Sequence, residues 1–409
     1  MTTTDLSPAP RPLALADGRP AAAAWPLQLG VVHLDHASWG AVPLVAQTQQ
    51  NRLRRQVEAW PGRWFAALPA RVAAARRPVA GFLQVSPRDL ALVPDAGAGR
   101  SVVYASVPPR PGGEILVTDH ADSGVSMGAQ RLARRWGGQV RTAHVPLDAD
   151  ADTAYACVAA GLGEATGLVV IDHITSVTAR RMPVRRIARE ARKLGVPVLV
   201  DGAHVPGLIK DPLSGLDCDF WVGDLHRFGC APRATAALVA RTDLREDLFP
   251  LIDSRGAPVP FPDRFDSPGT ADATSCLATP AALAFIEEMW GWETARTYMR
   301  ELADYGEEII GAALSELTGD DCRVDVGMPA NAMRLVRIPS PLAATAAEAE
   351  TLRDRVAQEL GVAAAFTSFG GVGYLRLSTH VYNTAADLET FAERGVPALW
   401  AWSRKRSRE

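Results

Sequence analysis

The chain has 409 residues, of which 47% are hydrophobic and 22% charged, and its formal net charge is −3. This is the composition of an ordinary globular protein, and the length suggests two or three domains. The slight negative charge argues against a general nucleic-acid surface, which needs a concentrated basic face. No apolar run approaches the roughly 20 residues of a membrane span. The odd, scattered cysteines favour a reduced, cytoplasmic protein.

The first 26 residues are rich in alanine and proline and lack the basic-then-apolar order of a signal peptide. We therefore expect a flexible lead-in at residues 1–26. The remaining chain divides into a large α/β domain at residues 27–280 and a small α+β domain at residues 281–409.

Three apolar runs in the large domain end in polar residues: residues 114–120, 167–173 and 196–201. Helix-like stretches separate them, and residues 184–194 form an amphipathic pattern. Such alternation predicts βαβ units and a mainly parallel sheet. Ligands of such sheets bind beyond the carboxyl ends of the strands, so the polar endings are predicted to converge there: Asp119, His120, Asp172, His173 and Asp201.

The C-terminal part has a different pattern. Helical stretches at residues 281–317 and 344–360 alternate with short strands at residues 334–338 and 372–377. This mixture predicts the smaller α+β domain.

Several segments, in order, carry a family resemblance: residues 33–40 (HLDHASWG), 172–176 (DHITS), 200–207 (VDGAHVPG), 219–232 (DFWVGDLHRFGCAP), 267–270 (SPGT) and 375–384 (LRLSTHVYNT). From about residue 33 to residue 383 the chain resembles class V aminotransferase-like enzymes, particularly the isopenicillin N epimerases. The resemblance implies the pyridoxal phosphate (PLP) fold type I, of the aspartate aminotransferase kind. That fold has a mainly parallel, seven-stranded type of sheet flanked by helices, plus a smaller α+β C-terminal domain.

The resemblance also implies roles for particular residues. Asp201 would pair with the pyridine nitrogen of PLP, and His204 would lie near the phenolate oxygen. Arg376 would hold a substrate carboxylate. The other implied site residues are His36 and Ser38 on the substrate side, Thr175 and His226 near the cofactor, and Thr270, which would reach the partner's phosphate in a homodimer.

Departures from the family pattern surround the cofactor position. Arg227 stands where the family has the lysine that forms an imine with PLP, and a guanidinium stays protonated and cannot supply that amine. Asp122 stands where an aromatic ring or histidine would stack. Gly97 and Ala98 fall in a phosphate cup that lacks its usual hydroxyl. The lysines at positions 193, 210 and 405 are not expected to reach the ring.

We expect an enzyme without a cofactor that acts by acid–base chemistry on a small, carboxylate-bearing, amino-acid-derived intermediate of specialised metabolism. Asp201, His204, His226 and Arg227 are the candidate catalytic residues, with Arg376, His36, Ser38 and Asp122 around the substrate.

Two alternatives remain open. The protein could bind PLP or pyridoxamine phosphate non-covalently, as an epimerase, eliminase or aminotransferase-like enzyme, or it could be a non-catalytic pseudoenzyme. We expect no metal. The alternative is a metal set drawn from His120, Asp122, Asp172, His173, Asp201, His204, Asp224, His226 and Cys230.

Overall fold

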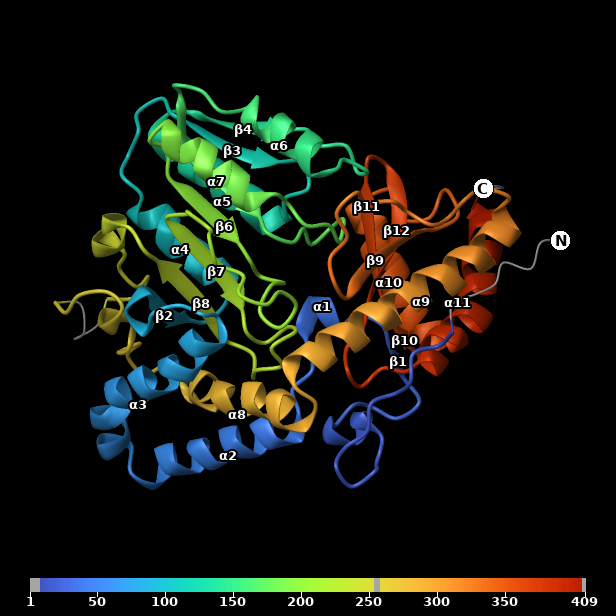
Figure 1. Ribbon diagram of the computed structural model, residues 1–409, viewed down its shortest axis with the longest axis horizontal. Coiled ribbons are helices and arrows are strands. Elements are labelled where there is room, and N and C mark those ends of the chain that lie inside the picture. Colours follow the sequence, from blue (N-terminus) through green and yellow to red (C-terminus); the bar gives the residue numbers. More distant parts are fainter. Residues whose placement is uncertain (1–7, 254–257, 407–409) are drawn as a thin grey trace. The chain divides into compact units, whose positions relative to one another are not determined.

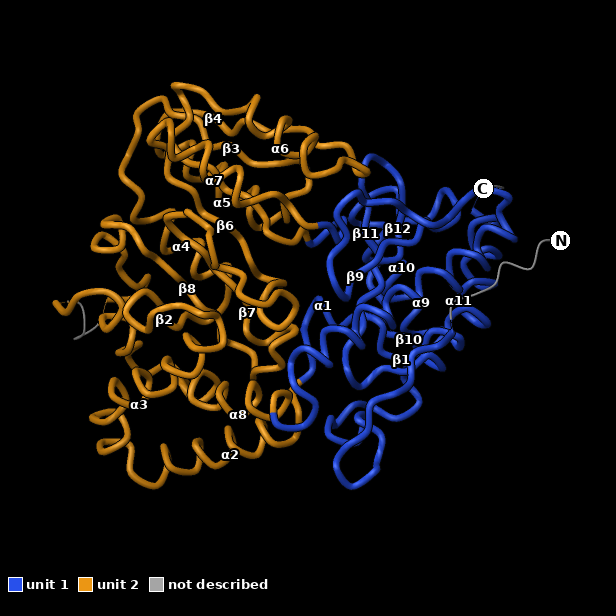
Figure 2. The backbone as a smooth tube through the Cα atoms, in the orientation of Figure 1, with its two compact units in different colours: residues 1–41, 176–180, 288–409 blue, residues 42–175, 181–287 orange. Residues whose placement is uncertain are grey.

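The computed structural model describes residues 8–253 and 258–406. The chain forms two compact units: unit 1 contains residues 1–41, 176–180 and 288–409, and unit 2 contains residues 42–175 and 181–287 (Figure 2). This division differs from the predicted one at the N-terminus, where residues up to 41 belong with the C-terminal unit. Within the predicted lead-in, Trp25 is buried and stacks on Trp290. Residues 1–7 lie outside the described part.

Unit 2 is built on a seven-stranded sheet in the order β2-β8-β7-β6-β5-β3-β4 (Figure 1). Only the pairs that β8 makes, with β2 and β7, are antiparallel in this sheet. The predicted mainly parallel sheet is therefore confirmed. The strands are β2 (Leu90–Val93), β3 (Glu114–Thr118), β4 (Gln139–Ala143), β5 (Thr166–Asp172), β6 (Val198–Asp201), β7 (Phe220–Asp224) and β8 (Ala236–Ala240).

The central strands are buried along their whole length because helices cover both faces of the sheet. Every residue of β5, β6, β7 and β8 is buried, as expected for a sheet covered on both sides. α4 packs on α5, and α6 packs on α7. Right-handed crossovers place these two pairs on opposite faces.

The helices of unit 2 follow the strands in the usual alternation. In α7 the buried residues are Val184, Ile187, Ala188 and Ala191, one stripe at helical spacing. The helices are α2 (Leu44–Ala59), α3 (Pro61–Phe82), α4 (Ala96–Ser106), α5 (Ser123–Trp136), α6 (Ala151–Ala159), α7 (Val184–Lys193) and α8 (Thr274–Met289), whose last residues belong to unit 1.

Unit 1 contains a three-stranded antiparallel sheet in the order β11-β12-β9 and a short parallel pair, β1 with β10. The long helices α9 and α11 pack on each other (Figure 1). The elements are β1 (Val32–His33), α1 (His36–Trp39), α9 (Trp292–Thr318), β9 (Met333–Arg337), α10 (Ala346–Leu360), β10 (Val362–Ala363), β11 (Ala365–Phe369), β12 (Val372–Ser378) and α11 (Ala385–Arg406).

Among the described residues, no helix has both the length and the apolar character that crossing a bilayer would require.

Candidate active site

Three neighbouring strands of unit 2 each end in an aspartate. Asp172 ends β5, Asp201 ends β6 and Asp224 ends β7. Asp172 and Asp201 are direct partners in the parallel register, and all three residues are buried. Buried carboxylates need a counter-charge or a proton, so the chemistry of this edge depends on what neutralises each one.

Asp201 is neutralised by Arg100, which α4 supplies from its second turn. The guanidinium Nη1 donates to Asp201 Oδ2, and Asp201 Oδ1 accepts from the backbone N–H of Ala203 at 2.9 Å. Burial by itself lowers the pKa of Arg100, but the adjacent Asp201 charge outweighs burial and raises that pKa above its ordinary value. The two side chains therefore form a largely buried ion pair.

Asp172 is neutralised in a different way. Burial raises the pKa of Asp172 well above its ordinary value, and the neighbouring Asp201 charge raises it further. Within the described part of the chain, its Oδ2 has no hydrogen-bond partner. Asp172 thus tends to keep its proton, which leaves a carboxylic acid beside the Arg100–Asp201 pair.

Arg227 lies where the family resemblance places a lysine, three residues beyond the end of β7. Its Nε donates to Asp224 Oδ2 at 2.9 Å, and its Nη1 lies 3.5 Å from both ring nitrogens of His204. Asp224 also accepts from the backbone N–H of Ala96 at 2.8 Å, which fixes it against the start of α4.

His226 lies beside the same pair. Its Nδ1 is 3.9 Å from Asp224 Oδ1, too far for a hydrogen bond, and has no partner among the described residues. Burial lowers the pKa of His226, which Asp224 opposes and Arg227 reinforces. His226 is therefore biased to the neutral, proton-accepting form.

The residues predicted for the phosphate cup and ring position begin helices. Gly97 and Ala98 lie in the first turn of α4, where the Ala98 N–H donates to Asp95 Oδ1 at 2.6 Å. Asp122 caps α5 by accepting from the Gly124 N–H at 2.8 Å. Thr175 is fully buried just beyond β5, whereas Thr270 is exposed on a loop of unit 2.

The substrate-side residues form a separate cluster within unit 1. Arg376 on β12 is buried, and its Nη1 donates to the Ser176 carbonyl at 2.8 Å and to the Ser176 hydroxyl at 3.1 Å. Its Nη2 donates to Asp35 Oδ1 at 3.0 Å and to Ser38 Oγ. The guanidinium is therefore paired with a carboxylate of the protein itself.

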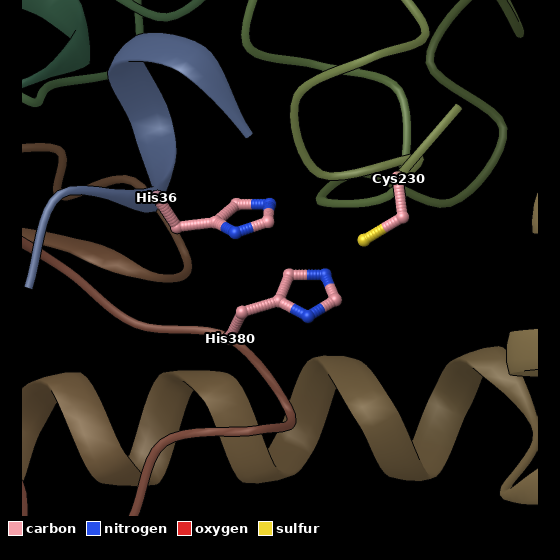
Figure 3. A group of neighbouring side chains, drawn as sticks. All are labelled: His36, Cys230 and His380. Carbon is pink, nitrogen blue, oxygen red and sulfur yellow. The ribbon is translucent and has the colours of Figure 1, made fainter. Parts of the chain in front are cut away.

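His36 belongs to an aromatic group next to this cluster. Its ring stacks on that of His380 with centroids 4.1 Å apart, as seen in Figure 3. Its Nδ1 lies 2.9 Å from the Tyr382 hydroxyl. These contacts are within unit 1 and hold His36 at the start of α1.

The structure thus brings His204, His226 and Arg227 together around Asp224 in unit 2, with Asp201 at the end of the neighbouring strand β6. In unit 1 it brings together His36, Ser38 and Arg376. Sequence reasoning missed the pairing of Arg376 with Asp35. An acidic residue inside the segment HLDHASWG was the available signal.

Comparisons with known proteins identify the relatives. The chain is 29% identical to isopenicillin N epimerase of Streptomyces clavuligerus over 93% of this chain and 98% of that protein. It is 30% identical to isopenicillin N epimerase of Amycolatopsis lactamdurans over 90% of this chain and 95% of that protein. Among solved structures, a lysine-to-alanine mutant of C-DES with glycine covalently linked to the PLP cofactor matches with a TM-score of 0.75. The match has 19% identity over 92% of this chain and 99% of that one.

The expectation that the protein uses no cofactor is wrong. The C-DES mutant, which has the fold of this chain, holds PLP. Non-covalent binding of PLP or pyridoxamine phosphate, the alternative expectation, is compatible with this finding.

The buried carboxylates of unit 2 suit the charge of such a cofactor, but none of the described lysines lies beside them to form a covalent bond with it. Asp201 is a buried carboxylate at a strand end, which suits a protonated ring nitrogen. Asp172 Oδ2 is a buried oxygen with no described partner. The lysines lie elsewhere: Lys193 pairs with Glu190 on the exposed side of α7, Lys210 is exposed, and Lys405 is near the end of α11.

The family assignment rests on most of the chain rather than on these side chains alone. Residues 65–391 match the profile described as aminotransferase class-V. That range includes the whole parallel sheet of unit 2 and the antiparallel sheet of unit 1. The chain belongs to the aminotransferase class-V family.

Proposed function

We propose that this protein is a class V enzyme that binds its cofactor without a covalent bond, either as pyridoxamine phosphate or as PLP already joined to a substrate amine. The observation that carries the proposal is the ion pair at the end of β7, in which Arg227 Nε donates to Asp224 Oδ2 at 2.9 Å. The same unit retains the buried carboxylate of Asp201. A guanidinium so held cannot act as an amine nucleophile.

The bound cofactor would supply an electron sink for the bond changes at the substrate's amine-bearing carbon. In this chain, Asp201 would orient the ring through its charge, with Arg100 and the Ala203 N–H fixing the carboxylate. Gly97, in the first turn of α4, would contribute its backbone N–H towards the phosphate, whereas the N–H of Ala98 is already taken by the Asp95 carboxylate.

In this proposal, the histidines of unit 2 move the proton at the reacting carbon of the substrate. His204 lies against the Arg227 guanidinium, and an imidazole can both accept and donate a proton. His226, biased to the neutral form, is a second acceptor. Epimerisation, elimination and half-transamination all need a proton moved at one carbon, so each reaction is open to this arrangement.

The proposed substrate is a small amino-acid-derived amine, which the similarity to isopenicillin N epimerases supports. We also propose a cytoplasmic homodimer. The exposed Thr270 and its neighbours Gly269 and Ala271 offer a loop that a second subunit could complete.

The test is covalent trapping. Wild-type protein and Arg227→Lys are incubated with PLP, reduced with borohydride and weighed by mass spectrometry. We expect Arg227→Lys to gain the mass of one reduced PLP at residue 227, and wild type to gain none there or at Lys210. Arg227→Gln is the matched control without an amine. Modification of a wild-type lysine that abolishes further cofactor binding would refute the lysine-free proposal.

A second measurement asks whether wild type binds the amine form. Pyridoxamine phosphate should raise the melting temperature of wild type, and Asp201→Ala should reduce that rise because the ring nitrogen loses its partner. An equal rise in both proteins contradicts the role given to Asp201.

A further inference from the structure

A groove runs between α4 and α5 of unit 2. The two helices pack on each other, and each lines the groove with residues at helical spacing. From α4 come Arg100, Ser101 and Tyr104, and from α5 come Gly124, Gly128 and Arg131. The volume of the groove is about 510 Å³, which is the size of a pocket for a small organic molecule.

The ring of Tyr104 forms the bottom of the groove. It lies so close to α5 that a Cβ built on Gly128 would be 2.4 Å from its Cε2 atom, and its hydroxyl donates to the Val125 carbonyl at 3.4 Å. Gly124 leaves room in the same way for Arg100, whose Nη2 would lie 3.3 Å from a Cβ there. The two glycines therefore let side chains of α4 reach across to α5 and close the groove at its bottom.

The groove carries positive charge that the protein does not compensate. Its guanidinium groups are those of Arg100, Arg131 and Arg134, and none of the described residues that line it is acidic. Arg100 is neutralised by Asp201. The side chains of Arg131 and Arg134 make no hydrogen bond or ion pair within the described part of the chain. Two uncompensated charges therefore lie three positions apart on α5, where side chains are neighbours.

These two arginines lie away from the strand ends that the proposed cofactor site uses. β2 and β3 run in the same direction and lead into α4 and α5, so both helices begin at that edge of the sheet and run back along it. Arg131 is eight positions beyond Ser123, the first residue of α5. At about 1.5 Å a residue, this is about 12 Å along the helix axis. A cofactor phosphate at Gly97, in the first turn of α4, leaves this part of the groove open.

Two neighbouring guanidinium groups favour a ligand with about two negative charges and several acceptor oxygens. A phosphate monoester carries about −1.5 to −2 charges at pH 7 and has three acceptor oxygens, and the planar donor fork of arginine matches phosphate. A carboxylate brings one charge and two oxygens, and it would leave one guanidinium unpaired.

We propose that the groove between α4 and α5 binds a small phosphate monoester through Arg131 and Arg134. This site is additional to the cofactor site and does not depend on the proposed function.

The experiment measures phosphate binding to the full chain without added cofactor. Inorganic phosphate, glycerol 3-phosphate and acetate are titrated by calorimetry at constant ionic strength into three proteins. These are wild type, the double variant Arg131→Gln, Arg134→Gln, and the control Arg52→Gln, which removes an exposed arginine of α2. We expect wild type and Arg52→Gln to bind both phosphates alike. The double variant should bind them at least about tenfold more weakly, because each lost guanidinium removes charged hydrogen bonds.

Three results would overturn the inference. The first is equal phosphate affinity of wild type and the double variant, and the second is wild type that binds neither phosphate. The third is acetate binding as tight as that of glycerol 3-phosphate, because the groove would then take any small anion.

Chemical modification provides a second measurement that needs no variant. Phenylglyoxal reacts with accessible arginines, and Arg52, Arg131 and Arg134 are all exposed. Glycerol 3-phosphate should slow the modification of Arg131 and Arg134 and leave that of Arg52 unchanged, as read from peptides by mass spectrometry. Equal modification rates with and without the phosphate would contradict the site. Neither measurement uses PLP, so this site and the lysine-free cofactor binding tested with borohydride can fail separately.

Discussion

At the scale of single residues, the strand ends of unit 2 contain two guanidinium–carboxylate pairs with different surroundings. Arg100 and Asp201 have side chains that are 13% and 4% exposed, and Arg227 and Asp224 have side chains that are 20% and 4% exposed. Breaking a buried pair leaves the surviving charge without compensation. The losses of stability from removing the two members of one pair should therefore not add up, because either change alone already breaks the pair.

For the Arg100–Asp201 pair we predict strong coupling. Asp201→Asn and Arg100→Gln should each lower the free energy of unfolding by about 3–5 kcal/mol, and the double variant should lose clearly less than the sum. Urea unfolding of the four proteins gives the double-mutant cycle. Lys193→Gln, which breaks an exposed pair on α7, should leave stability unchanged. Strictly additive losses would show that Arg100 does not neutralise Asp201.

Asp201 was predictable from the sequence, whereas its partner was not. An aspartate that ends an apolar run marks a strand end at any such sheet. Arg100 lies 101 positions earlier in the chain, and its contact depends on which face of α4 packs on the sheet. Likewise Asp35 and Arg376 are 341 positions apart. Local patterns locate the strand ends, but pairing across elements requires the packed structure.

At the scale of elements, α4 and α5 approach closely because α5 has no side chain at Gly128. A Cβ built there would lie 2.4 Å from Cε2 of Tyr104 on α4, and Tyr104 is buried. Gly128→Ala should thus overpack this contact and cost about 1–3 kcal/mol of unfolding free energy. Gly62→Ala in α3, where a Cβ meets nothing within 4 Å, should be neutral or stabilising. Chemical denaturation compares the two, and equal effects would contradict the contact.

Glu307 of α9, which packs on β9, is a titratable group whose effect on stability has a definite direction with pH. Burial raises the pKa of Glu307 to about 7, against the opposing charge of Arg334 and with further contributions from Asp304 and Arg323. The folded protein thus binds the proton more tightly than the unfolded chain. Stability from this group is present at low pH and is lost as pH rises from about 4.5 to about 7.

The corresponding prediction compares wild type with Glu307→Gln across that range. Between pH 4.5 and pH 7 the wild-type unfolding free energy should fall relative to that of the variant, by up to about 3 kcal/mol. The amide has no charge to bury, so the difference between the two proteins should level off above pH 7. A difference that grows in the opposite direction would mean that Arg334 holds Glu307 ionised.

At the scale of the whole molecule, the order of the elements could be predicted from the sequence. The unit to which the N-terminal segment belongs could not. The predicted apolar runs correspond to β3, β5 and β6, and the predicted amphipathic crossover corresponds to α7. These elements could be predicted because hydrophobic periodicity and the polar residues that end a strand are local features of the sequence. Residues 8–41 have weak periodicity and many alanines and prolines, so nothing local indicates that they pack with unit 1. Their fixed position comes from contacts with residues near 290 and 380.

Trp25 provides the test of that long-range packing. It is 4% exposed, stacks on Trp290 at 6.2 Å between centroids, and its indole N–H donates to the Ala41 carbonyl at 3.3 Å. Trp25→Ala should therefore lower the unfolding free energy by about 3–5 kcal/mol. The lost protection in hydrogen exchange should concentrate in unit 1. Leu29→Ala, at a side chain that is 95% exposed, should change stability by no more than about 0.5 kcal/mol. If Trp25→Ala behaves like Leu29→Ala, the N-terminal segment is a dispensable lead-in after all, and the chain's first 41 residues contribute nothing to holding Asp35 against Arg376.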